Sequence, residues 1–402
     1  MPFDHDLTSE KGISAYLTSI DIEHSDVELL TGGTANFVYR ATLFPGKTIV
    51  YKHAAPYLHS NTSFSFDPAR MDYEFHVLKI IPSLVQAHVP LSIVHAASVG
   101  HYDSGNKVLC MEDGGKRHLK DAYTDLSIDI SRVGTELGSW LAAVHTSTTR
   151  VSLSLIPDNN NLEENNATGV SVYRYAYANL ATALKEYCDS KSEIQSQSHA
   201  INSQDISLAQ EINDDYGSRL AYENECICHG DFWPGNVLVG SKSEALSSDI
   251  QSTTAAGSDL KLTVVDWEMT RRGTSATDVA QFCAEAFLLD RFRGGRGLLR
   301  GFLNAYLTAR FKHGRECFDK EWVRRMTIHW GVHVAFWPTR VEWADREGTQ
   351  KLVAIGAEVL RTATEGRWKE LFSIYPLKEV EDWIKEIVWE GDSTELDRAP
   401  NS

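Results

Sequence analysis

The sequence predicts an α+β protein with a small antiparallel-sheet lobe and a larger helical lobe. In the first 112 residues, short segments of alternating apolar and polar residues are separated by turn signals. The break Asp113-Gly114-Gly115 follows them, and beyond it apolar residues recur mainly at helical spacing. We therefore expect an N-terminal sheet lobe over residues 1–112 and a C-terminal helical lobe over residues 113–402.

The first lobe is expected to begin with a helix over residues 7–20. Three segments typical of strands follow and predict an antiparallel meander, over residues 27–30, 37–43 and 48–53. Gly32-Gly33 joins the first two segments and predicts a tight turn.

A polar loop is expected over residues 61–68, before the second helix of this lobe. That helix is predicted by apolar residues at helical spacing, namely Met71, Phe75, Leu78 and Ile81. Two further strands, near residues 92–101 and 107–112, complete the predicted sheet.

The second lobe is expected to be mainly helical, over residues 130–145, over residues 172–191 and from Asp266 to near the chain end. A short strand over residues 225–228 precedes the most distinctive stretch of the chain. The Ser/Thr/Ala-rich segment 241–259 has no periodicity and lies between two strands, so we interpret it as an extended hairpin loop without chemistry.

The composition is that of a globular protein, with 402 residues of which 42% are hydrophobic and 23% charged. The formal net charge of −16 argues against nucleic acid or an anionic membrane surface as the main partner, because both attract clustered Lys and Arg. No stretch is long and apolar enough to span a bilayer, and the first residues lack the pattern of a signal peptide. We expect a cytoplasmic protein.

The six cysteines show no paired CxxC spacing. Cys226-Ile227-Cys228-His229 raises the alternative of a metal site, but a soft metal ion would need further ligands. We interpret the cysteines as reduced and mostly buried thiols.

The strongest functional signal is the sequence His-Gly-Asp-Phe-Trp-Pro-Gly-Asn at residues 229–236, followed later by Val-Val-Asp-Trp-Glu at residues 264–268. Phosphoryl transfer from ATP needs one carboxylate that orients the acceptor hydroxyl, and an asparagine and a second carboxylate that hold magnesium. We assign Asp231 to the first task and Asn236 and Asp266 to the second. His229 is expected to brace the loop. Asp and Asn are also common turn residues, but their order, spacing and flanking strands together favour function.

A lysine on the third predicted strand, Lys52, has a candidate partner in Glu74 on the following helix. A lysine on an apolar strand usually faces solvent, but a Lys–Glu pair that directs the amine at the ATP phosphates is what a two-lobed kinase requires. The backbone amides of Gly32 and Gly33 are expected to cover the phosphates, although G-x-G-x-x-G is missing.

The link between the lobes is expected at Met111-Glu112-Asp113-Gly114, where the backbone can bind an adenine edge. Asp278 looks like a helix-start residue whose carboxylate caps free amides, with support of the magnesium loop as its function.

A basic stretch runs from Arg271 to Arg300, and we interpret it as a solvated helix face, with contact to an anionic substrate as the alternative. Most of the tryptophans are expected in the core. Trp337 and Trp343 are candidates for walls of an aromatic or cationic acceptor site.

The chain resembles the aminoglycoside phosphotransferase and choline kinase-like family over nearly its whole length. The most specific motifs of this resemblance are residues 229–236 and 264–268. The Trp-Glu after Asp266 is similar to this family and unlike the Phe-Gly of protein kinases. The nearest branch is the one that holds methylthioribose kinase and hydroxytryptamine kinase. This similarity rests on Gly32-Gly33 with Asn36, Lys52-His53-Ala54, Tyr73-Glu74-Phe75 and residues 333–343.

The resemblance implies a protein-kinase-like two-lobed fold, ATP and Mg²⁺ as cofactors, and a small hydroxylated molecule as acceptor. By the same similarity, Asp231 matches the catalytic base, Asn236 and Asp266 match the magnesium ligands, and Lys52 with Glu74 matches the phosphate-anchoring pair. The tryptophan content favours an aromatic or amine-bearing acceptor.

The predicted function is therefore ATP-dependent phosphoryl transfer to a hydroxyl of a small molecule. One alternative is a protein or fructosamine-type kinase, although Asp-Phe-Gly and Ala-Pro-Glu are missing. The other is a non-catalytic nucleotide-binding pseudokinase or scaffold, although the Lys, Asp, Asn and Asp of the site are all present.

Overall fold

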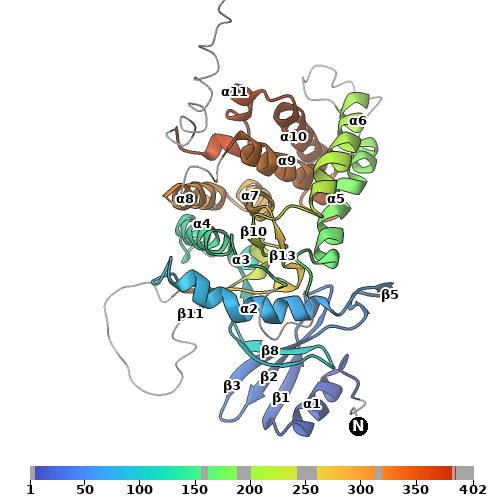
Figure 1. The fold of residues 1–402 in the computed structure, drawn as a ribbon, viewed down its shortest axis with the longest axis vertical. Helices are drawn as coiled ribbons and strands as arrows, with labels where there is room; N and C mark the ends of the chain where they lie inside the picture. The colour runs from blue at the N-terminus through green and yellow to red at the C-terminus, as the bar shows by residue number, and fades with distance from the viewer. Residues whose placement is uncertain are drawn as a thin grey trace, which may run out of the picture.

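The computed structural model describes residues 5–154, 162–187, 201–241, 260–312, 319–382 and 385. An antiparallel sheet lies at one end of the molecule and a helical region at the other, with helix α2 (Arg70–Gln86) crossing between them (Figure 1). The predicted two-lobed fold class is confirmed. The boundary at residues 112 and 113 stays a prediction.

The N-terminal sheet has the strand order β1-β2-β3-β8-β7, with every neighbouring pair antiparallel. Its strands are β1 (His24–Leu29), β2 (Phe37–Leu43), β3 (Lys47–His53), β7 (Val99–Asp103) and β8 (Val108–Glu112). Helix α1 (Glu10–Ser19) buries Ile13, Tyr16 and Leu17 in a small core with one face of this sheet. Its amino end is capped by the Ser9 side chain, which accepts from the Gly12 N–H.

The polar loop predicted over residues 61–68 is wrong over most of its length, because β4 (Tyr57–Leu58) and β5 (Asn61–Ser65) form an antiparallel hairpin there. Every residue of β5 is exposed, so the apolar alternation that marks a buried strand is missing from its sequence.

A second sheet, with the order β6-β12-β11-β9, carries the catalytic and metal loops at its strand ends. Its strands are β6 (Val94–Ala96), β9 (Arg117–His118), β11 (Val237–Ser241) and β12 (Leu260–Val264). β11 and β12 pair antiparallel in full register, as a hairpin requires. The predicted loop that joins them falls almost entirely on residues 242–259, outside the described residues.

The helical region surrounds α7 (Ser275–Phe292), of which the greater part is buried. The remaining helices are α3 (Leu119–Ala122), α4 (Ile130–Ser147), α5 (Ala167–Glu186), α6 (Ser203–Ile212), α8 (Leu298–Lys312), α9 (Lys320–Phe336), α10 (Arg346–Thr364) and α11 (Trp368–Leu371). Gly134 and Gly138 let α4 approach α8 closely, since a Cβ at Gly138 would lie 2.2 Å from the Phe302 carbonyl oxygen. In Figure 1, α4 and α8 lie on one flank of α7 and α5 on the other.

Besides the β4–β5 hairpin, the short strands β9 and β13 were not predicted from the sequence. β13 (Arg271–Gly273) follows the metal loop and pairs antiparallel with β10 (Cys226–Cys228), in a region expected to be helical. Over the described ranges, no helix is both long enough and apolar enough to cross a membrane.

Candidate active site

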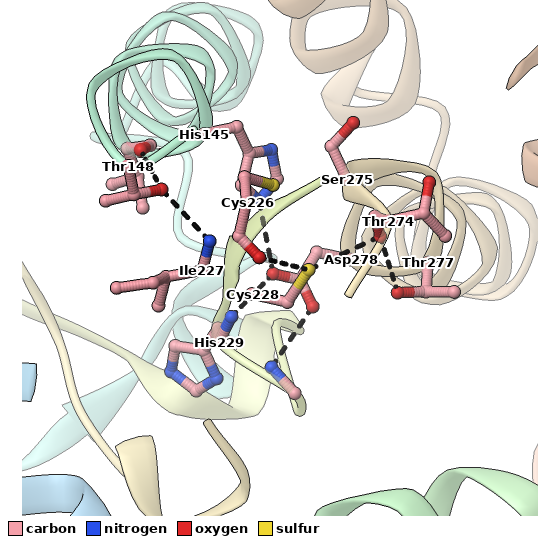
Figure 2. Close-up of polar contacts among 12 residues, drawn as sticks. His145, Thr148, Cys226, Ile227, Cys228, His229, Thr274, Ser275, Thr277 and Asp278 are labelled. Carbon is pink, nitrogen blue, oxygen red and sulfur yellow. Dashed lines mark hydrogen bonds and ion pairs between the residues drawn. The ribbon is translucent and has the colours of Figure 1, made fainter. Parts of the chain in front are cut away.

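The catalytic loop begins where β10 ends, and hydrogen bonds to Asp278 on α7 fix its first residues. The Asp278 carboxylate accepts from the backbone N–H of His229 at 2.7 Å and of Gly230 at 3.1 Å, as Figure 2 illustrates for His229. Gly230 has φ +82°, and a Cβ there would meet the Met269 carbonyl oxygen at 2.0 Å. The tight turn after His229 therefore requires glycine.

Asp231 is held by two side-chain amides. Gln281 Nε2 donates to its Oδ1 at 2.6 Å, and Asn236 Nδ2 donates to its Oδ2 at 3.0 Å. Burial, reinforced by the nearby Asp266 carboxylate, raises the pKa of Asp231 to about 7. A carboxylate with this pKa can accept a proton at neutral pH, which a general base must do.

His229 acts on the loop through its ring. Its Nε2 lies 3.0 Å from the Val265 carbonyl oxygen, its Nδ1 accepts from the Asp231 N–H at 3.2 Å, and the ring packs on Trp267 at 4.5 Å between centroids. Burial lowers the pKa of His229, so the ring is neutral and can donate on one side and accept on the other. These contacts tie the catalytic loop to the metal loop.

Asp266 begins the metal loop in a left-handed backbone conformation, with φ +67° and ψ +56°. The Lys52 ammonium bridges this carboxylate and Glu74, whose Oε2 it meets at 2.6 Å. Burial lowers the pKa of Lys52, but the carboxylates of Asp266, Glu74 and Glu268 outweigh this effect and raise the pKa above its usual value. The predicted Lys–Glu pair is therefore present, and it also reaches the metal loop.

The residues proposed to bind magnesium have hard oxygen donors available. Because Asn236 Nδ2 donates to Asp231, the amide orientation leaves Asn236 Oδ1 without a hydrogen-bond donor among the described residues. The Asp266 side chain is 35% exposed, and Lys52 contacts only its Oδ1. Oxygen donors with room for water and phosphate oxygens fit Mg²⁺.

A buried network ties the glycine turn to the metal loop, and sequence reasoning assigned it no role. Glu268 Oε2 accepts from Asn36 Nδ2 at 2.7 Å and from Arg70 Nε at 3.0 Å. Arg70, only 1% exposed, also donates to Asn36 Oδ1 and to backbone carbonyls before α2. The available signal was the acidic residue two positions after Asp266, but no local pattern indicates Arg70.

Replacing Arg70 by Met is expected to lower the free energy of unfolding by about 3–5 kcal/mol, because the buried Glu268 carboxylate would lose its hydrogen-bonded cation and keep only the longer contact with Lys52 at 3.9 Å. Equilibrium unfolding in urea measures this loss. Arg132→Met is the control, because it removes an exposed i,i+4 contact with Glu136 worth at most about 0.5 kcal/mol. Equal stability of the two variants would contradict the structural role of Arg70.

The remaining predicted nucleotide-binding residues lie in the turn between β1 and β2, at the end of β8 and directly after β8. Gly32, at φ +112°, and Gly33 form the turn between β1 and β2 with open space around both. Met111 is buried on β8, and the Glu112 carboxylate binds Ser98 at 2.6 Å and His95. A Cβ at Gly114 would lie 2.8 Å from Thr263, so packing against β12 accounts for this glycine.

A pocket lined in part by Asp231 opens between α5, α7 and α9. Its empty volume of about 350 Å³ includes space that is open to solvent, and it is lined by Val172, Tyr173, Ala176, Asp231, Gln281, His329, Val332, His333 and Trp337. The lining is mainly apolar and aromatic with a few polar groups, as in sites for small molecules. Trp337 therefore faces the pocket, whereas Trp343 packs against Lys120 and Arg293.

Two sequence interpretations in this region are wrong. The interpretation of a solvated helix face is wrong for Arg271 and Arg272, which are buried, whereas Arg291 on α7 and Arg300 on α8 are exposed. Arg272 donates to several backbone carbonyls, including that of Thr148. Asp278 does not cap α7, because Thr274 is the N-cap and accepts from the Ala276 N–H. Asp278 instead supports the catalytic loop, since strand β10 lies against the start of the helix.

Cys110, Cys226, Cys228 and Cys283 are buried free thiols, as predicted. The structure brings His145 to within 4.8 Å of Cys226 and Cys228 (Figure 2). Both ring nitrogens of His145 are already engaged, with the Tyr306 hydroxyl at 2.9 Å and Asp278 Oδ2 at 3.3 Å. We therefore interpret this cluster as structural support for Asp278.

Comparison with known proteins places these features in a family. A 4-hydroxytryptamine kinase of Psilocybe cyanescens is 25% identical over 384 residues, covering 90% of this chain and 94% of the relative. That of Psilocybe cubensis is 24% identical over 375 residues, covering 89% and 94%. A solved amicoumacin kinase complex with AMP-PNP and Ca²⁺ aligns at 11% identity and a TM-score of 0.49, covering 89% and 94%. The model of the phosphotransferase enzyme family matches residues 26–248, more than half of the chain, so this protein belongs to that family.

Proposed function

We propose that this phosphotransferase moves the γ-phosphoryl group of ATP to a hydroxyl of a small aromatic amine, with Asp231 as the catalytic carboxylate. The observation that supports this most is the position of Asp231. Its side chain lines the pocket, and its Oδ2 accepts a hydrogen bond from the proposed metal ligand Asn236. An acceptor in the pocket and a metal-bound nucleotide would then meet at this carboxylate.

In the proposed reaction, the acceptor oxygen forms a bond to the γ-phosphorus while the bond from that phosphorus to the β–γ bridging oxygen breaks. ADP leaves, and the hydroxyl proton passes to Asp231. Lys52, oriented by Glu74, exchanges its contact with Asp266 for the α- and β-phosphates. Mg²⁺, held by Asn236 and Asp266, would neutralise phosphate charge when bound.

The acceptor class follows from the charge and shape of the pocket. Among the lining residues, all in the described part of the chain, there is no Lys or Arg, and burial keeps the pKa of His329 well below its usual value. Glu285, one helical turn after Gln281, binds His333 Nε2 through Oε1 at 2.8 Å. The Asp231 carboxylate in the lining and the Glu285 carboxylate behind His333 favour a cationic amine, and Trp337 favours an aromatic ring. The relatives from Psilocybe are named for an aromatic amine.

The test is calorimetric titration of Mg-ATP into the protein, followed by ADP-release assays with a panel of hydroxylated acceptors, 4-hydroxytryptamine first. Saturable Mg-dependent binding and turnover of an aromatic amine would support the proposal. Binding of Mg-ATP without turnover of any acceptor would contradict it and favour a non-catalytic nucleotide-binding protein. The cytoplasmic location stays a prediction.

Replacing Glu285 by Gln is expected to raise the KM for 4-hydroxytryptamine by about tenfold, because the negative charge behind His333 that favours the ammonium group is lost. Gln can still bind His333, so the pocket keeps its shape. 4-Hydroxyindole, which has the same ring and hydroxyl without the amine, is the control substrate. A similar rise in KM for both compounds would show that Glu285 does not recognise the amine.

A further inference from the structure

Gln281 places a hydrogen-bond donor against the proposed catalytic carboxylate. Its Nε2 lies 2.6 Å from Asp231 Oδ1, and it lines the same pocket as Asp231. A side-chain amide has a carbonyl oxygen and an NH₂ group, and only the NH₂ group can donate to a carboxylate. A rotation of the amide by half a turn would set its carbonyl oxygen against Asp231 and repel the carboxylate. The orientation of this side chain therefore matters for the position of Asp231.

Tyr173 determines that orientation from the other side. Its hydroxyl lies 2.5 Å from Gln281 Oε1 and 3.3 Å from Asp278 Oδ1, so its single proton is directed to the amide oxygen, the nearer acceptor. Burial and the Asp278 carboxylate raise the pKa of Tyr173, so the phenol keeps its proton and remains a donor. A donor at this place requires the carbonyl end of the amide to face Tyr173, which leaves the NH₂ facing Asp231.

The Tyr173 ring is itself held in place. It stacks on His329 with 5.1 Å between ring centroids and 13° between planes. His329 Nδ1 in turn lies 2.8 Å from the Tyr177 hydroxyl, one helical turn along α5. Tyr173 is 7% exposed. The hydroxyl that orients Gln281 thus belongs to a packed side chain with little freedom to move.

We infer that Gln281 is a positioning residue for phosphoryl transfer, and that Tyr173 acts through it by fixing the amide that holds Asp231 toward the acceptor. The inference rests on the proposed function of Asp231. Asn236 holds the other oxygen of the carboxylate, so the two amides together set its plane. A misplaced catalytic group slows transfer without weakening nucleotide binding, because neither Tyr173 nor Gln281 belongs to the residues proposed to hold ATP.

The experiment is a double-mutant cycle in which turnover is measured as ADP release. The acceptor is the compound of the panel that turns over fastest, with 4-hydroxytryptamine tried first. Gln281→Met is expected to lower kcat by about 100-fold, with an unchanged KM for ATP. Tyr173→Phe is expected to lower kcat by about tenfold, because one hydrogen bond that orients the amide is lost. The double variant is expected to be no slower than Gln281→Met.

Two further variants separate positioning from packing. Gln281→Glu keeps an acceptor for Tyr173 but sets a second carboxylate against Asp231, so it is expected to be slower than Gln281→Met. Tyr175→Phe removes an exposed hydroxyl from the same helix, outside the chain of contacts to Asp231, and its kcat is expected to stay within about threefold of wild type. Multiplicative losses in the double variant, or equal turnover of the Glu and Met variants, would overturn the inference.

Failure of the proposed function can be distinguished from failure of the inference about Gln281 and Tyr173. If the wild-type protein turns over no acceptor, or if Asp231→Asn is fully active, the function assigned to Asp231 is wrong. A neutron crystal structure of Tyr173→Phe, in which the amide nitrogen and oxygen are distinguished, then still tests the orienting contact. The inference requires the Gln281 amide to turn or move away from Asp231 in that variant, and an unchanged amide would overturn it.

Discussion

Replacing Asp231 by Asn is expected to lower kcat by about 10²–10⁴-fold, because the acceptor hydroxyl loses its proton acceptor. The loss is expected to be severe for a second reason. Both carboxylate oxygens accept from amides, so the NH₂ group of an introduced Asn would face a donor from either Gln281 or Asn236. Steady-state kinetics with saturating ATP measure the effect, because the change lies in the chemical step.

Mg-ATP binding by this variant, measured by calorimetry, is expected to stay close to that of the wild type. Asp215→Asn is the matched control, since that carboxylate is half exposed and pairs with Arg219 on the surface. A full rate in Asp231→Asn would contradict catalysis by this residue. Loss of nucleotide binding together with turnover would instead assign Asp231 to the metal site.

Replacing Asp266 by Ala is expected to abolish Mg-dependent ATP binding while the protein stays folded. The change removes a carboxylate proposed to bind the metal, and it leaves Lys52 paired with Glu74 and, at 3.9 Å, with Glu268. The left-handed backbone at Asp266 adds a cost of about 1–2 kcal/mol for Ala, which tolerates this conformation poorly. Calorimetric titration with and without magnesium measures binding, and thermal unfolding measures the remaining stability.

Asp266→Asn separates these two effects. Asn is tolerated in the left-handed region and keeps an oxygen ligand, so the Asn variant is expected to be more stable than the Ala variant and to bind Mg-ATP weakly. Unfolding of both variants at room temperature would identify Asp266 as a structural residue. Full binding by both would remove it from the metal site.

Features that depend on local pattern could be predicted from the amino-acid sequence. The meander of β1, β2 and β3, the helix with Glu74, and the loops with Asp231 and Asp266 all follow from alternation, helical spacing and turn residues within short windows. The contact of Lys52 with Glu74 was also accessible, because a strand and the next helix come from nearby parts of the chain. Family resemblance then indicated the reaction.

The tertiary structure alone decided which distant polar side chains meet. Arg70 and Glu268 are 198 positions apart, and Asp231 and Gln281 are 50 apart. These contacts form because a polar group that leaves water needs a partner, and packing of the helices and sheets decides which partner is within reach. No periodic pattern records that choice. Packing also decides that Arg271 is buried, with its guanidinium 4.9 Å from the centroid of the Tyr173 ring, although its surrounding sequence is rich in arginine.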